Sequence, residues 1–521
     1  MKKIIGLVVI IAVLVLGGYY GTGLVTESTI EKNVEIINQS NGLLVDITHY
    51  NRGWYSSTAV LNWRLHVPER LSKDQNGQST TVPAQDYSVQ MPLTIYHGPI
   101  IFSDSGVKFG LGYARSDVTV PEMYVKKFSN LFTGDSTKPL INLSLFVNYL
   151  NNSQLHMGLP GFKLILKQGG EQFEWYGMDS HINVTSNLRN IDGGVVVEGA
   201  RLTRDKIDAT LGKVFSNYDL HQTAEGLYLG QASLSVPSFS VAENQQKILD
   251  LVQFDISSSS DVDSGLFNTY FKTSLKQITV HGRTYGPAVL EISLKNLDAQ
   301  VLTDINDQAN KMQQGTDAER QQAMLSILPA LPKLFGKGAQ FEVSKLSFVV
   351  PEGEIVGDLL VSLPKGDTGN PFQLLQKVQG HGQLKMPAAI VKGIMTASVK
   401  QQLLSKPTLQ QEMVQQMQKN DQSQDQAQIQ AQVAQAKAEA PVQTGADGQS
   451  NTAAQSSEQN KPLTAADVEQ QASAQADQKL SAMVQGGLLS LQGSEYVIEV
   501  NLQQGQLTVN DKPFNPAMLQ F

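Results

Sequence analysis

The chain has 521 residues, no cysteine and a formal net charge of −8 at pH 7. The lack of cysteine excludes a disulfide framework and any thiolate chemistry. The acidic balance argues against a nucleic-acid partner, which would favour a basic surface. A chain of this length can bury a core without disulfides, and length alone suggests about two to four domains.

The N-terminus carries an export signal. Two lysines precede an unbroken apolar run over residues 4–16, followed by glycines and two tyrosines. A lysine-led apolar segment is typical of secretory signals, and the run is near the lower length limit for spanning a bilayer. Small residues at 21–23 leave cleavage open, although no A-x-A triplet is present. We expect a cytoplasmic n-region (1–3) and a transmembrane signal anchor (4–21). The bulk of the chain would then lie in the periplasm, at the cell inner membrane.

Several helices are expected. A juxtamembrane helix over Thr26–Gln39 has helical spacing and is stopped by Asn41-Gly42, within a segment spanning 22–42. Further helices are predicted, in chain order, over Pro121–Leu131, Glu243–Val252, one or two within Asp307–Phe335, and Pro387–Leu404.

In residues 43–404, which we expect to form a β-rich body, apolar and polar residues alternate with the period of two that is typical of β-strands. Tyr55–Val67 alternates apolar and polar residues, and Ile355–Leu363 does so again. Leu227–Val236 repeats the pattern with a one-residue slip at Gly230, which predicts a bulge. Such one-sided strands belong to antiparallel sheets. The expected fold class is therefore α+β, predominantly β, with long amphipathic antiparallel sheets and a few packed helices.

The composition changes after this body. Residues 405–485 form a Gln- and Ala-rich insertion without aromatic residues, with expected disorder near 440–460 and helical flanks around 410–438 and 464–485. Residues 486–521 resume strand alternation, and Gln503–Gln506 predicts the turn of a hairpin that completes the body.

Motifs for catalysis and cofactor binding are mostly absent. The sequence contains no G-x-S-x-G elbow, no H-E-x-x-H and no P-loop. Asp261–Asp263 and Asp304–Asp307 lack the spacing of a calcium loop. His49 and His66 would need carboxylates to hold zinc if a hairpin brought them together. We therefore predict no catalytic, cofactor or metal site.

Two motifs stand out. Asn51-Arg52-Gly53 has turn chemistry between two strand patterns, and it is followed by two aromatic residues that should point to opposite faces. Tyr96–Pro99 and Thr284–Ala288 share a Tyr-(His)-Gly-Pro pattern. If both mark the same turn, the body contains a two-fold internal repeat, roughly 43–240 and 245–365.

The order of these motifs resembles that of a known family. The set is Tyr50-x-Arg52-Gly53-Trp54-x-Ser56, Tyr96-His97-Gly98-Pro99, Tyr285-Gly286-Pro287, Asn296-Leu297-Asp298 and Gly505-x-Leu507-x-Val509-Asn510. Together with the lysine-led anchor it resembles the YdgA-like proteins of Gram-negative bacteria, a family of unknown function. The resemblance implies an inner-membrane, periplasm-facing protein that self-associates as a homodimer.

The resemblance supplies no catalytic residues. The motif residues expected to have structural roles are Tyr50, Arg52, Gly53, Trp54, Ser56, His97, Gly98, Pro99, Gly286 and Pro287. Family members often close with Asn-Gly-x-Pro-Phe, whereas this chain has Asp511 in place of the glycine. That departure bears on the turn, because aspartate tolerates a positive φ less well than glycine.

Three functional hypotheses follow. The leading one is a non-enzymatic, membrane-anchored envelope scaffold or binding protein. The alternative is a lipid-binding or lipid-chaperoning β-groove, because one-sided strands can curl around an apolar ligand. A second alternative is a hydrolase with an unrecognised site, which a buried carboxylate beside a histidine would favour.

Overall fold

The computed structural model describes residues 18–515, except 29, 32–33, 36–37, 39–42, 68–69, 74–78, 104–105, 187, 225, 315–326, 367–375 and 405–464. The predicted anchor core, the N-terminal flank of the insertion and its expected disordered centre lie outside these residues. Within the described residues, no helix combines the length and apolar character that a membrane span requires. The chain divides into two compact units. The first comprises residues 1–351, 356–382 and 502–505, and the second comprises 352–355, 383–501 and 506–521.

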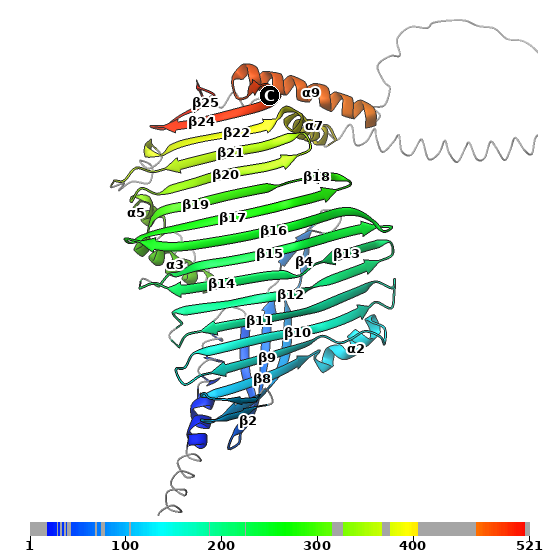
Figure 1. Ribbon diagram of the computed structural model, residues 1–521, viewed down its shortest axis with the longest axis vertical. Helices are drawn as coiled ribbons and strands as arrows, with labels where there is room; N and C mark the ends of the chain where they lie inside the picture. Colours follow the sequence, from blue (N-terminus) through cyan, green and yellow to red (C-terminus); the bar gives the residue numbers. More distant parts are fainter. Residues whose placement is uncertain are drawn as a thin grey trace, which may run out of the picture. The chain divides into compact units, whose positions relative to one another are not determined.

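The first unit is built on an antiparallel meander, in which most strands pair with those before and after them (Figure 1). Its main strands are β1 (Leu43–Arg52), β2 (Ser56–Val67), β5 (Gln85–His97), β8 (Gly112–Thr119), β9 (Leu140–Val147), β10 (Ser153–Ile165), β11 (Gln172–Val184), β12 (Asn190–Arg204), β14 (Val214–Gln222), β15 (Tyr228–Glu243), β16 (Gln246–Asp263), β17 (Leu266–Val280), β19 (Ala288–Asp298), β20 (Gln340–Val350) and β21 (Gly353–Ser362). The predicted β-rich, antiparallel fold is confirmed.

Short strands complete this part of the chain. They are β3 (Arg70–Lys73) with β4 (Ser79–Val82), β6 (Ile101–Ser103) with β7 (Gly106–Lys108), β13 (Ile207–Leu211) beside β12 and β15, and β18 (Arg283–Tyr285) beside β17.

The meander keeps one polar and one apolar face. Directly opposed residues on antiparallel strands share a face, so the register can be followed across the sheet. One apolar row runs from Ile95 through Ala114, Leu145 and Leu155 to Ile182. Farther along, the same row reaches Phe271 and Ile292. A polar row on the other face runs through Asn217, Ser233, Ser257, Lys272 and Glu291.

Helices cover only parts of the sheet. The helix α2 (Glu122–Leu131) follows β8. The helices α3 (Ala299–Gln314) and α5 (Leu331–Phe335), with the 3-10 turn η1 (Leu328–Ala330), lie at one end of the central strands (Figure 1). There they pack buried clusters around Leu297, Leu334 and Ala299. The predicted helices over Pro121–Leu131 and within Asp307–Phe335 are confirmed where they are described, although α3 begins eight residues earlier.

A helix predicted over Glu243–Val252 is wrong. Asn244 and Gln245 both adopt positive φ, 51° and 67°, and form the tight turn between β15 and β16. The apolar spacing of Ile248, Leu249, Leu251 and Val252 fits a helix, but pairing with β15 and β17 on both sides overrides that local preference. The repeat boundary expected at 240–245 falls within this hairpin, between strands that pair directly.

The bulge expected at Gly230 is also wrong. Pairing with β14 continues through Gly230 without a register shift, and pairing with β16 starts at Gly230. Gly230 instead adopts φ 144°, a conformation that favours glycine. Leu227 and Leu229 pack with Ala299 at the start of α3, so the slip in the pattern marks a change of environment rather than an inserted residue.

The second unit pairs two helices with a short strand group. The helix α7 (Ala388–Leu404) packs on α9 (Ala465–Gly486) through Val399, Leu403, Val468 and Ala472. The predicted helix over Pro387–Leu404 is confirmed, as is the helical flank near 464–485. The strands are the end of β22 (Gln379–Pro387), β23 (Ser490–Gln492), β24 (Glu495–Gln503), β25 (Gln506–Val509) and β26 (Lys512–Pro513). The predicted turn at Gln503–Gln506 joins β24 to β25.

Candidate functional site

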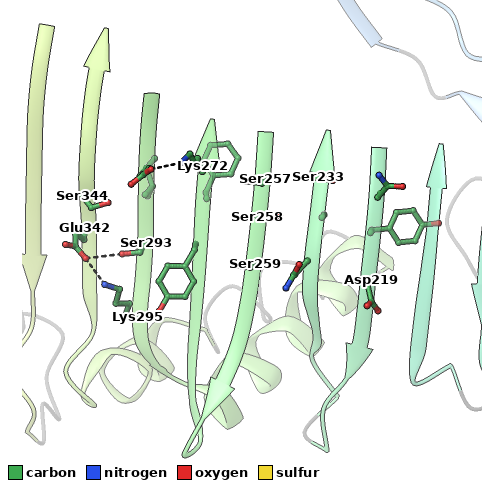
Figure 2. Close-up of a pocket in the computed structure, with 18 residues that line it drawn as sticks. Asp219, Ser233, Ser257, Ser258, Ser259, Lys272, Ser293, Lys295, Glu342 and Ser344 are labelled. Carbon is green, nitrogen blue, oxygen red and sulfur yellow. Dashed lines mark hydrogen bonds and ion pairs between the residues drawn. The ribbon is translucent and has the colours of Figure 1, made fainter. Parts of the chain in front are cut away.

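A trough crosses the polar face of the meander in the first unit. It has a volume of about 740 Å³ and spans β14, β15, β16, β17, β19 and β20 (Figure 2). Serines form much of its floor, at positions 233, 257 and 259. Their small side chains leave the space that longer residues on the same rows would fill. The flanking strands supply larger polar side chains, so the hollow follows from the residue sizes along each row.

Charge pairs close one side of the trough. Lys272 Nζ lies 2.9 Å from Glu291 Oε1, and Lys295 Nζ lies 2.7 Å from Glu342 Oε2. Ser293 also donates a 3.2 Å hydrogen bond to the Glu342 carboxylate (Figure 2). The hydrogen bond from Lys295, its positive charge and the Ser293 hydroxyl lower the pKa of Glu342 despite some desolvation. These four charged side chains are therefore paired with one another within the protein.

The floor of the trough is chemically different. Asn217, Asp219, Gln231, Ser233 and Ser257 line it, and their side chains form no hydrogen bond or ion pair within the described structure. Tyr270 presents a ring that is 41% exposed beside them, and Lys295 Nζ lies 5.8 Å from the centre of that ring. The arrangement offers uncommitted donors and acceptors next to an aromatic surface.

The opposite face carries an apolar strip. We define the strip as the aliphatic and aromatic side chains on the apolar face of β9 to β20: Leu143, Leu145, Leu155, Met157, Ile182, Val195, Val197, Val214, Leu234, Ile256, Phe271, Leu290, Ile292, Val343 and Leu346. None of these side chains is buried, and Leu145 and Phe271 are 36% and 38% exposed.

Most motif residues meet at the N-terminal end of the sheet, against the helix formed by residues 18–28. Arg52 Nη1 lies 3.0 Å from Glu27 Oε2, and its guanidinium lies 5.2 Å from the centre of the Tyr20 ring. The Tyr20 ring in turn lies 6.2 Å from the ring of Trp54. We call this helix and the motif residues around it the helix clamp.

Glycines allow the close approach in the helix clamp. A Cβ on Gly98 would lie 2.0 Å from the Tyr19 ring, and a Cβ on Gly23 would lie 2.8 Å from the His97 ring. Gly98 also adopts φ 128°, which other residues avoid. The Tyr19 hydroxyl donates a 2.5 Å hydrogen bond to the carbonyl of Ile100, just beyond Pro99. The Tyr-His-Gly-Pro motif is thus a docking surface for this helix.

A serine–histidine pair lies buried under the clamp. Ser57 Oγ and His97 Nε2 are 3.0 Å apart, and both residues are 1% exposed. Burial lowers the pKa of His97 and, with nearby Glu27, raises the pKa of Tyr50. Among the described residues no carboxylate contacts the His97 ring, and a substrate could not reach Ser57. The pair lacks the oriented base and access that a hydrolase nucleophile needs, so it gives no support to the hydrolase hypothesis.

The remaining motif residues lie apart from the clamp or act through the backbone. Gly53 donates a 3.0 Å hydrogen bond to the carbonyl of Ser56 and closes the β1–β2 turn. Trp54 and Tyr55 are both exposed there, at 62% and 66%. Gly286 and Pro287 belong to a separate turn, where they exchange backbone hydrogen bonds with Val349.

Histidines and carboxylates do not gather into a metal site in the part of the chain that the structure describes. His49 lies opposite Val60 and His66 opposite Asp86, so the β1–β2 hairpin does not bring the two histidines together.

The alternation of apolar and polar residues predicted an apolar face of the sheet, but no sequence motif indicates the trough. The run Ser257–Ser260 was the available signal for the trough, since serines on both faces of one strand leave space on each. These serines line a trough only because six strands pair in one particular register, and no local sequence pattern predicts that register.

The whole chain was compared with protein-family models, and residues 1–517 match the family described as bacterial protein of unknown function (DUF945). The chain belongs to this family. No curated protein matches the chain. Membership agrees with the resemblance to an uncharacterised bacterial family, and it assigns no role to the trough, the strip or the clamp.

Proposed function

We propose that the protein is a non-enzymatic binding protein of the cell envelope, held at the inner membrane by its N-terminal segment, whose apolar strip binds the acyl chains of lipids. The observation that carries this proposal is the exposure of the strip. Its partly exposed apolar side chains extend across ten strands, interrupted by small or polar residues such as Ser180 and Thr273, and extended apolar surface marks binding sites.

The dimensions of the strip fit acyl chains. It crosses ten strands from β9 to β20, and a spacing of ~4.8 Å between strands gives a length of roughly 43 Å. An acyl chain covers about half of the ~30 Å hydrocarbon core of a bilayer. Whole chains can therefore lie along the strip, against side chains such as Leu234, Ile256 and Leu290.

The position of the clamp supports a bilayer as the source of these lipids. The helix at residues 18–28 follows the lysine-led apolar run directly in the sequence. Its partners are His97, the last residue of β5, and Gly98, which follows it; Ile95 on the same strand begins the apolar row that continues into the strip. A lipid leaving the membrane beside the anchor would meet this end of the sheet first.

The proposal is tested with the full-length chain purified in a mild non-ionic detergent. Mass spectrometry should detect copurified phospholipid, and a photoactivatable palmitate analogue should crosslink to strip residues. Ile256→Asp places a charge on the strip and should reduce crosslinking severalfold, since desolvating a carboxylate opposes apolar contact.

Ser257→Asp is the matched control, because residue 257 lies on the opposite face and the variant should crosslink like the parent. Lack of both lipid and crosslinks would overturn the proposal. So would a dimer in which a second copy covers the strip and protects Ile256, a result that favours a self-associating scaffold instead.

A further inference from the structure

We infer that the trough on the polar face is a second binding site, which takes a neutral oligosaccharide. It lies on the face opposite the apolar strip and is independent of lipid binding. The inference rests on three features of the trough: its uncommitted polar floor, its exposed aromatic ring and its charge.

The floor matches the hydrogen-bonding pattern of a sugar. The hydroxyls of Ser233 and Ser257 and the amides of Asn217 and Gln231 both donate and accept, whereas the carboxylate of Asp219 accepts only. A sugar presents hydroxyls that donate and accept in the same way. A purely apolar ligand would leave these groups desolvated and unpaired, at a cost that disfavours it.

Tyr270 gives the site an apolar surface of the right kind. Its ring is 41% exposed, and Ser259 and Ser293 lie directly opposite it on the neighbouring strands. These short neighbours leave Tyr270 partly exposed at the hollow, with Lys295 Nζ over its ring. The C–H face of a sugar ring can pack there while its hydroxyls reach the floor, as in sites that combine an apolar wall with a few polar groups.

The charge and the length of the trough further limit the class of ligand that it can bind. The lining contains Lys272 and Lys295 against Asp219, Glu291 and Glu342, so the site is slightly acidic and disfavours polyanions. Four strand spacings from β14 to β19 give ~19 Å, which is long enough for several sugar rings in a row. A neutral chain of sugars satisfies both conditions.

The test measures binding of chitotetraose, a neutral tetramer of N-acetylglucosamine, to the full-length detergent-solubilised chain by saturation-transfer NMR and calorimetry. Tyr270→Ala should weaken binding at least about tenfold, whereas Tyr270→Phe keeps the ring and should bind like the parent. Ser233→Tyr should fill the trough and abolish binding. All variants are first compared by circular dichroism and thermal unfolding.

Ile256→Ala is the matched control, since Ile256 adjoins Ser257 in sequence, lies on the apolar strip and is not among the residues that line the trough. It should leave chitotetraose binding unchanged and weaken palmitate crosslinking. The inference is overturned if no saturable binding occurs at millimolar sugar, if Tyr270→Ala and Ile256→Ala lose equal affinity, or if a tetra-alanine peptide binds at the trough in preference to the sugar.

Discussion

Two parts of one apolar row differ in how far their side chains are buried. Ile95, near the helix clamp, is 1% exposed, whereas Leu145 and Phe271 in the same row are 36% and 38% exposed. All three residues are large and apolar, and each is paired with a neighbouring strand on both sides. The difference is the helix at residues 18–28, which contacts the sheet around His97 and Gly98. Where a covering element is present the face becomes a core, and where none is described it remains a surface suited to a ligand.

Gly98→Ala should have the largest effect, on the covered end. The new Cβ would collide with the Tyr19 ring and force an alanine to adopt φ 128°. Overpacking and a glycine-only conformation together cost about 3–5 kcal/mol. Thermal unfolding should show a large drop in midpoint. Gly134→Ala has open space around its Cβ, and it should stay close to the parent.

Comparing Ile95→Ala with Ile256→Ala tests the contrast between core and strip directly. Because Ile95 is buried, the Ile95→Ala variant should lose about 3 kcal/mol of unfolding free energy, as for other large-to-small core substitutions. The half-buried Ile256 should lose about 1 kcal/mol, since less apolar surface is withdrawn from water there. Denaturant unfolding gives both values, and equal losses would mean that the strip is also a covered core.

The pH dependence of the clamp should follow His97. Burial lowers the pKa of His97 below the ordinary value of about 6.5, so the unfolded chain binds a proton at a pH where the folded chain does not. The stability that neutral, buried His97 contributes is therefore fully present above the pKa that this histidine has in the unfolded chain. It declines as the pH falls below that value. His97 faces Ser57 and the backbone of Tyr19, and the Arg52 guanidinium acts on it through its charge.

Thermal unfolding between pH 7.5 and 5 should show this decline, and His97→Gln should flatten it. An identical pH profile in the two proteins would assign the decline to other groups.

Asp511→Gly should have the smallest effect. Asn510 and Asp511 have φ 47° and 62° in the turn before β26, so the sequence-based concern about a positive φ at this position is confirmed. Glycine removes that strain but adds freedom to the unfolded chain. A net gain of about 0.5 kcal/mol is expected from the balance of the two. An Asn510→Gly variant, which also loses the hydrogen bonds of its side chain to Glu499 and Gly487, should instead be destabilised.

The sequence predicted what depends on neighbours in the chain. Alternation in Tyr55–Val67 predicted β2 and its faces, and Pro121 and Pro387 marked the starts of α2 and α7. The helix predicted over Glu243–Val252 was wrong, because two residues with positive φ form a hairpin turn there despite the helical spacing of the apolar residues. The clamp was visible only as motifs, because no local pattern reveals that Arg52 reaches Glu27 across the sequence.

Single-cysteine labelling tests the central contrast most directly, since the parent chain has no cysteine. Ile95→Cys and Ile256→Cys, each in the full-length protein, would be exposed to a soluble maleimide with and without phospholipid. We expect Ile256→Cys to react rapidly and to be protected by lipid, while Ile95→Cys stays unreactive in both conditions. Equal, slow labelling at the two positions would contradict the account, because it would place the strip inside a closed core.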